Sequence, residues 1–355
     1  MSARPAHGPV VRFWPHMPAA EVASTRIRCL QVIAALRAQG ADAALFDARQ
    51  PPPAVLVLGK RSDAASIAQA RALQAAHGVR LVLDLCDNHF WAAQPTERLR
   101  DRAALLRAAV LAVDCVVCAS PRLAEIVRAE CPGVRHIEVV DDSLDPLALQ
   151  SAAGWRGLQL EAWRLVHRAT PGRRLVWFGQ ATSEFGEAGI ADIGRIAPVL
   201  AAAHRQNPLT LTVISNRRDI WRRHAPGWGF PSLYLPWKAT TFGGLLRRHD
   251  IALIPVTLNP FTECKTSNRA LTAFAAGLAV ASDAMPAYAR LSQAIVVDDW
   301  ASGLPRLMDD AVERARRIEA AAAVIQARHE PAAIARQWQA LLAGLVTGAT
   351  PAVPA

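Results

Sequence analysis

Short, largely apolar segments alternate with helical segments along most of the chain, and this alternation constrains the fold more than any other feature. Ala54–Leu58 and Leu81–Leu83 are apolar at every position. A strand without a polar face must be buried on both sides, and a parallel sheet covered by helices provides that environment. Strands that alternate with helices are connected by crossovers that build such a sheet. The sequence therefore predicts an α/β fold with parallel sheets covered on both faces.

The first half predicts one such domain over residues 1–148. The expected strands are Val10–Trp14, Ala43–Phe46, Ala54–Leu58, Arg80–Asp84, Val113–Cys118 and His136–Val140. The expected helices are Glu21–Gln39, Asp63–His77, Thr96–Ala112 and Pro121–Glu130. Thr96 is expected to cap its helix, and Pro121 suits the first helical position.

The alternation stops and then resumes, which predicts a second domain. Residues 149–172 are expected to be a linker with one helix, Leu158–His167, and residues 173–330 the second domain. Its expected strands are Leu175–Phe178, Leu209–Ile214, Leu233–Leu235, Ile251–Pro255, Ala279–Ser282 and Ile295–Val297. Its expected helices are Glu187–His204, Thr241–Arg248, Asn268–Ala276 and Ala301–Arg328. Two doubly wound, Rossmann-like domains would face a cleft.

The end of the chain is expected to return to the first domain. Residues 331–348 hold a last helix, Ala332–Leu345, which follows Pro331 and is predicted to cross back. Residues 349–355 are expected to be a disordered tail, as chain ends often are.

Composition limits the partners. The formal net charge is +10, but the cations are almost all Arg and are spread along the helices, so a nucleic-acid partner is not predicted. A basic face toward anionic lipid stays open. The longest apolar stretch, Ala103–Ala119, is interrupted by Arg107 and Asp114, so any membrane contact would be peripheral. The expected location is cytoplasmic, with the inner face of the membrane as an alternative.

The cysteines predict buried thiols rather than a metal site. Cys115 and Cys118 have the spacing of a metal or redox pair but lie in an expected strand, where positions three apart face opposite sides. The sequence has no second Cys or His pair at zinc spacing and no Asp-x-Asp. We therefore expect free thiols, a reducing compartment and no metal.

A polar segment before a predicted helix suggests a phosphate site. Lys265, Ser267, Asn268 and Arg269 surround the helix start within Phe261–Val280. Unpaired N–H groups and nearby cations at a helix start can hold a phosphate. The alternative is that Ser267 is an ordinary cap and the cations are solvated.

A second polar loop follows the strand Leu81–Leu83. Asp84, Asp87 and His89 are expected at the cleft side, and Lys60 follows a neighbouring strand at the same edge. Acids and a His there could orient the hydroxyl groups of a ligand or share a proton. The alternative is that Asp87 or Asn88 caps the next turn and His89 is a surface residue. Because both polar loops would open into one cleft, the functional interpretation is favoured.

The second half contains an ordered series of motifs: Pro236-Trp237-Lys238, Asp250–Pro255, Lys265–Arg269 and Ala275–Ser282. This series resembles the donor half of GT-B glycosyltransferases, particularly glycosyltransferase family 4. In the first half, Ala23–Arg28, Val117–Ser120 and Val139–Asp145 resemble that family's first helix segment, strand exit and domain end.

The resemblance implies a bacterial-type sugar transferase. It would bind a nucleoside-diphosphate sugar through Gly179, Arg217, Lys238, Lys265, Ser267, Asn268, Arg269 and Thr272. A glycan or lipid-linked acceptor would meet Arg26, Arg28 and Lys60, and the catalytic candidates are Asp84, Asp87, His89 and Glu263. Retention of configuration is implied, and neither cofactor nor metal is. The oligomeric state is not predicted.

The sequence departs from the family pattern at the donor site. The two Glu residues that the family places eight positions apart correspond to Cys264 and Thr272, and Glu263 is the nearest substitute for the first. The usual Arg and Lys after the first strand of the second domain are absent, and the nearest cations are Arg217, Arg218 and Lys238. Two alternatives therefore stay open: an inactive binding or scaffold protein, and a nucleotide-sugar epimerase.

Overall fold

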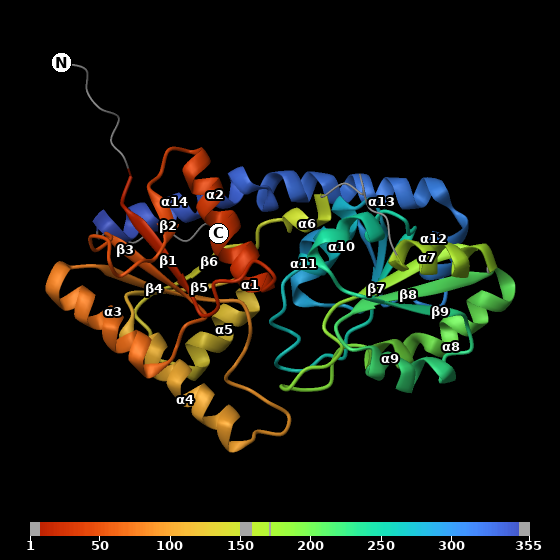
Figure 1. Cartoon of the computed structure of the whole chain (residues 1–355), viewed down its shortest axis with the longest axis horizontal. Coiled ribbons are helices and arrows are strands. Elements are labelled where there is room, and N and C mark those ends of the chain that lie inside the picture. Colours follow the sequence, from red (N-terminus) through yellow and green to blue (C-terminus); the bar gives the residue numbers. More distant parts are fainter. Residues whose placement is uncertain (1–7, 150–157, 170–171, 348–355) are drawn as a thin grey trace, which may run out of the picture. The chain divides into compact units, whose positions relative to one another are not determined.

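The computed structural model describes residues 8–149, 158–169 and 172–347. These residues form two compact units, each built on a sheet (Figure 1). The first unit holds the chain up to Ser143, the short segment Cys264–Thr266 and the chain from Gln326. The second unit holds Leu144–Glu263 and Ser267–Ile325.

The first unit contains a parallel sheet of six strands in the order β2-β1-β3-β4-β5-β6. The strands are β1 (Val11–Pro15), β2 (Ala43–Leu45), β3 (Val55–Gly59), β4 (Arg80–Leu85), β5 (Cys115–Cys118) and β6 (Ile137–Val139). Every residue of β3 and β5 is buried, as their apolar sequences predict. The predicted parallel sheet is thus confirmed.

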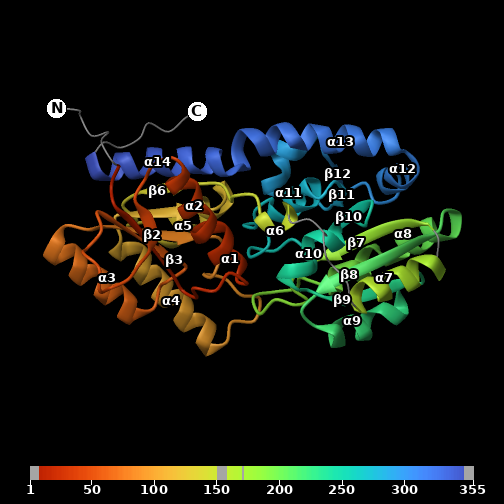
Figure 2. The ribbon, with the colours of Figure 1, turned by 45° about the horizontal axis from the view of Figure 1, so that its top comes forward.

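Helices cover both faces of this sheet, as Figures 1 and 2 show. One face carries α2 (Gln31–Ala38) and α14 (Pro331–Thr347), and the other carries α3 (Ala64–His77), α4 (Glu97–Ala112) and α5 (Pro121–Glu130). A short helix α1 (Ala23–Thr25) and a π-helical turn (Arg26–Leu30) precede α2. Thr96 caps α4 as predicted, because its side chain accepts from the Leu99 N–H at 3.4 Å.

The last helix, α14, packs in the first unit, which confirms the predicted return of the chain. Ile334, Trp338 and Leu341 are buried in the same apolar cluster as β1 and α2. The Trp338 ring meets Phe13 of β1 edge-to-face, with ring centroids 5.4 Å apart.

The second unit repeats the architecture with the strand order β12-β11-β10-β7-β8-β9. Its strands are β7 (Arg173–Phe178), β8 (Leu209–Ser215), β9 (Ser232–Pro236), β10 (Ile251–Ile254), β11 (Ala279–Ser282) and β12 (Ile295–Val297). One face packs against α6 (Pro146–Leu149), α7 (Leu158–Ala169), α10 (Ala239–Leu246), α11 (Asn268–Ala275) and α13 (Ala311–Val324). The other face packs against α8 (Ala191–Gln206), α9 (Arg218–His224) and α12 (Gly303–Asp309).

Several boundaries differ from those expected. The units divide after Ser143, and the buried side chains of α7 belong to the second unit, although 149–172 was expected to be a linker. The helix expected from Glu187 begins at Ala191, because Gly189 adopts φ +107° and its N–H bonds the Asp192 carboxylate at 2.9 Å. The long helix expected over 301–328 is divided into α12, α13 and a π-helical turn.

Some expectations lie outside the described residues. These are part of the linker, at 150–157 and 170–171, and the tail at 349–355. Cys115 and Cys118 are free and buried, as predicted. Among the helices of the described ranges, none combines the length and the hydropathy that a membrane span requires.

Candidate functional site

The carboxyl ends of β3 and β4 lie side by side in the first unit, with Gly59 opposite Asp84. Lys60 follows β3 with φ +53°, and its N–H donates to the Asp84 carbonyl at 2.9 Å. A left-handed backbone costs energy for a residue with a side chain, so the surrounding structure must impose it on Lys60. The turn directs the polar residues after both strands to one edge of the sheet.

Asp87 is the centre of a cluster of charges at this edge. Its two carboxylate oxygens accept from the ammonium groups of Lys60 and Lys265. His89 Nε2 lies 3.9 Å from Asp87 Oδ2, and Arg102 Nη2 lies 3.2 Å from His89 Nδ1. The structure therefore brings together the predicted residues Lys60, Asp87, His89 and Lys265.

The charges of this cluster argue against proton transfer by Asp87. Burial alone would raise the pKa of Asp87, but the ammonium groups of Lys265 and Lys60 outweigh it and hold the pKa well below its usual range. Burial, together with the field of Lys60, lowers the pKa of His89 to about 3. At neutral pH Asp87 is a carboxylate with little affinity for a proton, and His89 is neutral. Both side chains are better suited to position other groups than to act as bases.

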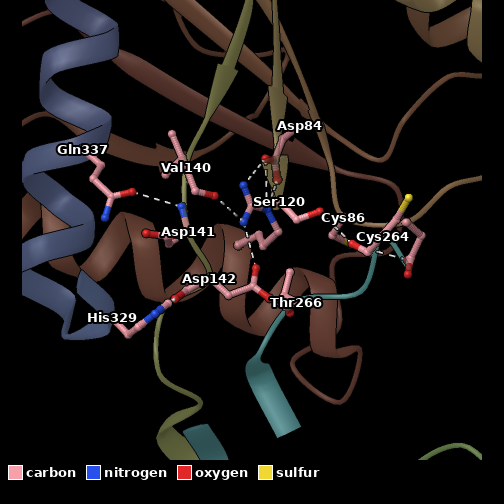
Figure 3. A network of polar contacts seen from close by, with 12 residues as sticks. Asp84, Cys86, Ser120, Val140, Asp141, Asp142, Cys264, Thr266, His329 and Gln337 are labelled. Carbon is pink, nitrogen blue, oxygen red and sulfur yellow. Dashed lines mark hydrogen bonds and ion pairs between the residues drawn. The ribbon is translucent and has the colours of Figure 1, made fainter. Parts of the chain in front are cut away.

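Arg28, Asp84 and Asp142 form a second, buried network beside this cluster (Figure 3). Arg28 Nη2 and Nε bond Asp84 Oδ1 and Oδ2 at 2.6 and 2.8 Å, and Arg28 Nη1 bonds Asp142 Oδ1 at 2.8 Å. Burial opposes the charge of Arg28, but the attraction of Asp84 and then of Asp142 raises the Arg28 pKa well above its ordinary value. The guanidinium is therefore charged and fully engaged.

This network changes the roles expected for three residues. Arg28 is 3% exposed and Asp84 2%, so neither can meet an acceptor or substrate from solvent in this structure. Arg26 is also buried, and its Nη1 donates to the Ala20 carbonyl at 2.7 Å. Arg28 and Asp84 turn into the fold, where each satisfies the other's buried polar groups, and Arg26 bonds a nearby backbone carbonyl. Their observed contacts are structural.

A cleft of about 620 Å³ opens next to Lys60 in the first unit. Its lining comes from the exits of β1 and β3, from the segment up to the α3 cap, and from the N-terminal part of α4: His16, Lys60, Arg61, Ser62, Asp63, Glu97, Arg98, Asp101, Arg102 and Leu105. Of these residues, only Lys60 is a site residue predicted from the sequence. The others could have been found from the rule that ligands bind beyond the carboxyl ends of parallel strands. That rule points to the residues around the helix caps Asp63 and Thr96.

In the second unit, the start of α11 lies against the end of β7. Arg269 Nη1 is 3.5 Å from the position that a Cβ of Gly179 would occupy, and Gly179 has φ +154°. Thr272 is 2% exposed, and its hydroxyl has no hydrogen-bond partner in the described part of the chain. Ser267 precedes α11, but its side chain makes no capping hydrogen bond. The structure thus brings Gly179 and Arg269, two of the predicted donor-site residues, close together.

Among the other predicted donor residues, Arg217 is exposed and pairs with Asp219 at 2.6 Å, and Lys238 is exposed. Glu263, half-buried, ends the loop before the Cys264–Thr266 segment. The loop after β7 is held instead by Ser215, which donates to the Gly179 carbonyl at 2.7 Å, and by Asn216, which accepts from the Ala181 N–H at 3.0 Å. Neither was predicted from the sequence, although Ser215 ends β8 and Asn216 follows it at the same sheet edge.

No family model and no curated protein matches the chain. Solved structures do match over nearly the whole chain. The Anabaena protein HepE, in complex with UDP and glucose, is 12% identical, with a TM-score of 0.62 over 94% of this chain and 99% of that one. The sucrose-phosphate synthase of Thermosynechococcus elongatus is 12% identical, with a TM-score of 0.64 over 95% and 99%.

A third match is WaaG, a glycosyltransferase involved in lipopolysaccharide biosynthesis, at 13% identity and a TM-score of 0.60 over 94% of this chain and 100% of that one. The two parallel sheets of the Rossmann-like units and the matched structures point to the same fold. The chain has the GT-B fold. At this low identity the likeness establishes the fold, and activity has to be argued from the site.

Proposed function

We propose that this GT-B protein is a glycosyltransferase, which moves a hexosyl or related group from a nucleoside-diphosphate sugar to a glycan or lipid-linked acceptor. The single observation that carries the proposal is the surroundings of two side chains of α11. The Arg269 guanidinium lies against Gly179, which has no side chain, and the buried hydroxyl of Thr272 has no hydrogen-bond partner among the described residues. HepE, which shares the fold, was solved with UDP and with UDP-glucose.

The donor's diphosphate would lie at the start of α11. Helix N–H groups favour phosphate oxygens, and a guanidinium can bind them through two parallel hydrogen bonds. Gly179 lets the diphosphate approach the backbone closely, since it has no side chain. The hydroxyl of Thr272 would pair with a hydroxyl of the donor, which removes the cost of an unsatisfied buried polar atom.

Catalysis would consist of positioning and of stabilising the leaving diphosphate. Arg269 and Lys265 supply positive charge in that sequence segment, and we propose that they make a divalent cation unnecessary. The acceptor would bind to the first unit, in the cleft beside Lys60. Asp87 and His89 would orient charges there instead of transferring protons. We expect the reaction to retain the anomeric configuration.

The test is nucleotide binding by the purified protein and its Lys265→Ala variant. Titration calorimetry with UDP, GDP and ADP should reveal one nucleotide that binds. Removing the charged hydrogen-bond donor of Lys265 should raise the dissociation constant of that nucleotide by about 10- to 100-fold, the effect of a charge-assisted hydrogen bond. Arg49→Ala is the matched control, because Arg49 is 90% exposed and should leave the affinity unchanged. Equal affinities of wild type and Lys265→Ala would place the diphosphate elsewhere.

Thr272 gives specific support to a second candidate, a sugar-nucleotide-binding protein without transferase activity. A neutral hydroxyl offers a ribose one bond where a carboxylate offers two. A panel of nucleotide sugars and acceptors separates the candidates. Transferred sugar supports the transferase, and binding without turnover on every donor supports the binding protein. An epimerised donor detected by product NMR would identify an epimerase.

A further inference from the structure

The segment Cys264–Thr266 is fixed in the first unit by three independent contacts. Cys264 is fully buried in the apolar cluster beneath β3, β4 and α5, and its carbonyl accepts from Ser120 Oγ at 2.8 Å. Thr266 Oγ1 donates to Asp142 Oδ2 at 2.6 Å, as Figure 3 shows. Between them, the ammonium of Lys265 pairs with Asp87. The residues on either side of the segment belong to the second unit.

Asp142 is a rigid acceptor for the Thr266 hydroxyl. Its other carboxylate oxygen accepts from Arg28 Nη1 at 2.8 Å. Its carbonyl accepts from His329 Nδ1 at 2.9 Å, and a carbonyl can only accept, so this nitrogen carries the proton. Because both oxygens of the carboxylate are engaged, the side chain has one orientation in which all these bonds are made.

Arg28 transfers this rigidity to the sheet. It is held by both oxygens of Asp84, the residue opposite Gly59 in the pairing of β4 with β3. It also donates to the carbonyl of Val140 at 3.1 Å. Thr266 is therefore connected through Asp142, Arg28 and Asp84 to the sheet edge that carries Lys60 and Asp87. This chain of bonds limits where Thr266 can lie relative to that edge.

We propose that Thr266 and Asp142 are positioning residues for Lys265. Their hydrogen bond fixes the backbone next to Lys265, so that the ammonium rests at Asp87, beside Lys60, before a donor is present. A lysine side chain has many rotamers, and ordering it costs entropy. A backbone held on both sides reduces the number of positions that the ammonium can reach, and part of that cost is met during folding. This proposal rests on the proposed function, in which Lys265 binds the donor's diphosphate.

The proposal predicts how fast Lys265 reacts with an acylating reagent. The chain has three lysines, at positions 60, 238 and 265, so mass spectrometry can follow each one separately. The exposed Lys238 serves as the internal reference. In the wild type we expect the order Lys238, Lys265, Lys60, since the side chains of Lys265 and Lys60 are 39% and 16% exposed and both are ion-paired.

Thr266→Val removes the hydroxyl while conserving the side-chain volume. The ratio of the Lys265 rate to the Lys238 rate should rise by about two- to tenfold, the range that one net hydrogen bond controls. Thr266→Ser restores the hydroxyl and should return the wild-type ratio. Thr240→Val, at an exposed position of α10, is the matched control and should not change it. A wild-type ratio in Thr266→Val, or a raised ratio in Thr266→Ser, would overturn the proposal.

Nucleotide affinity gives the second readout. With the nucleoside diphosphate that binds the wild type, Thr266→Val should raise the dissociation constant by about two- to tenfold. In the Thr266→Val background, Asp142→Asn should cost less than it does in the wild type, because the Thr266–Asp142 bond is already absent there. Additive losses would overturn the proposal. If the wild type binds no nucleotide, the proposed function fails, and the labelling ratio still decides whether Thr266 positions Lys265.

Discussion

Replacing Asp87 by Asn tests whether the charge cluster stabilises the first unit. The change keeps the size of the side chain and removes the negative charge that faces Lys60 and Lys265. The exposed fractions of Asp87 and Lys60 are 14% and 16%, so this pair is largely buried. Lys265 is 39% exposed, and solvent can replace its partner at little cost.

The expected loss of stability follows from the Lys60 pair. Removing one partner of a buried ion pair typically costs about 3–5 kcal/mol, because a charge stays buried without compensation. The amide oxygen of the new Asn still accepts a hydrogen bond, so we expect about 3 kcal/mol, the lower end of that range. The double variant Lys60→Met with Asp87→Asn leaves no such buried charge and should recover most of the loss.

The assay is urea unfolding of the three proteins, combined with hydrogen exchange of peptides from β3 and β4. The folded pKa of Asp87 is depressed, so its contribution is complete above its unfolded pKa and is lost as the pH falls through the folded pKa. The difference between wild type and Asp87→Asn should therefore be constant from pH 7 to about pH 5 and shrink below about 3.9. A single variant within about 0.5 kcal/mol of wild type at pH 7, or a double variant no more stable than the single, would refute the reasoning.

Two further substitutions test the packing of each unit by urea unfolding. Trp338→Ala, at a fully buried position of α14, should cost about 3–5 kcal/mol, and Arg336→Ala on its exposed side should change little; equal effects would mean that α14 contributes no core. Gly189→Ala should cost about 1–3 kcal/mol, because φ is +107° and the new Cβ would lie 2.2 Å from a carbonyl oxygen. Gly194→Ala, in α8 with open space around it, should instead stabilise by about 0.5–1 kcal/mol, and a loss there would contradict this view.

Local sequence patterns predicted the fold well because the signals act over a few residues. The apolar segment Ala54–Leu58 became a fully buried strand, and Thr96 caps its helix as expected. Errors occurred where a distant residue decided the outcome. The helix expected from Glu187 starts later because Gly189 and Asp192 form a bonded turn that also holds Thr257. The π-helical turn Arg26–Leu30 likewise interrupts the helix expected over Glu21–Gln39, and within it Arg28 reaches Asp84, 56 positions away.

The site was predicted in part. The sequence placed Lys60, Asp87 and His89 at one sheet edge, because the carboxyl ends of parallel strands meet there. It could not show that Arg28 and Asp84 bond each other, since they lie 56 positions apart. An Arg and an Asp fit a solvent-facing site as well as they fit a buried ion pair. It also missed Ser215 and Asn216, whose role depends on the neighbouring loop after β7.

The sequence by itself determined that there are two parallel sheets, the succession of strands and helices along the chain, and the presence of cations around the start of α11. Only the tertiary structure decided what those cations meet. Lys265 pairs with Asp87, 178 positions away, and Thr266 bonds Asp142, 124 positions away. The physical reason is the sequence separation over which each interaction acts. Secondary structure follows from the spacing of apolar residues over a few turns. An ion pair depends on the burial of its two groups and the distance between them, which are set only when both elements have packed.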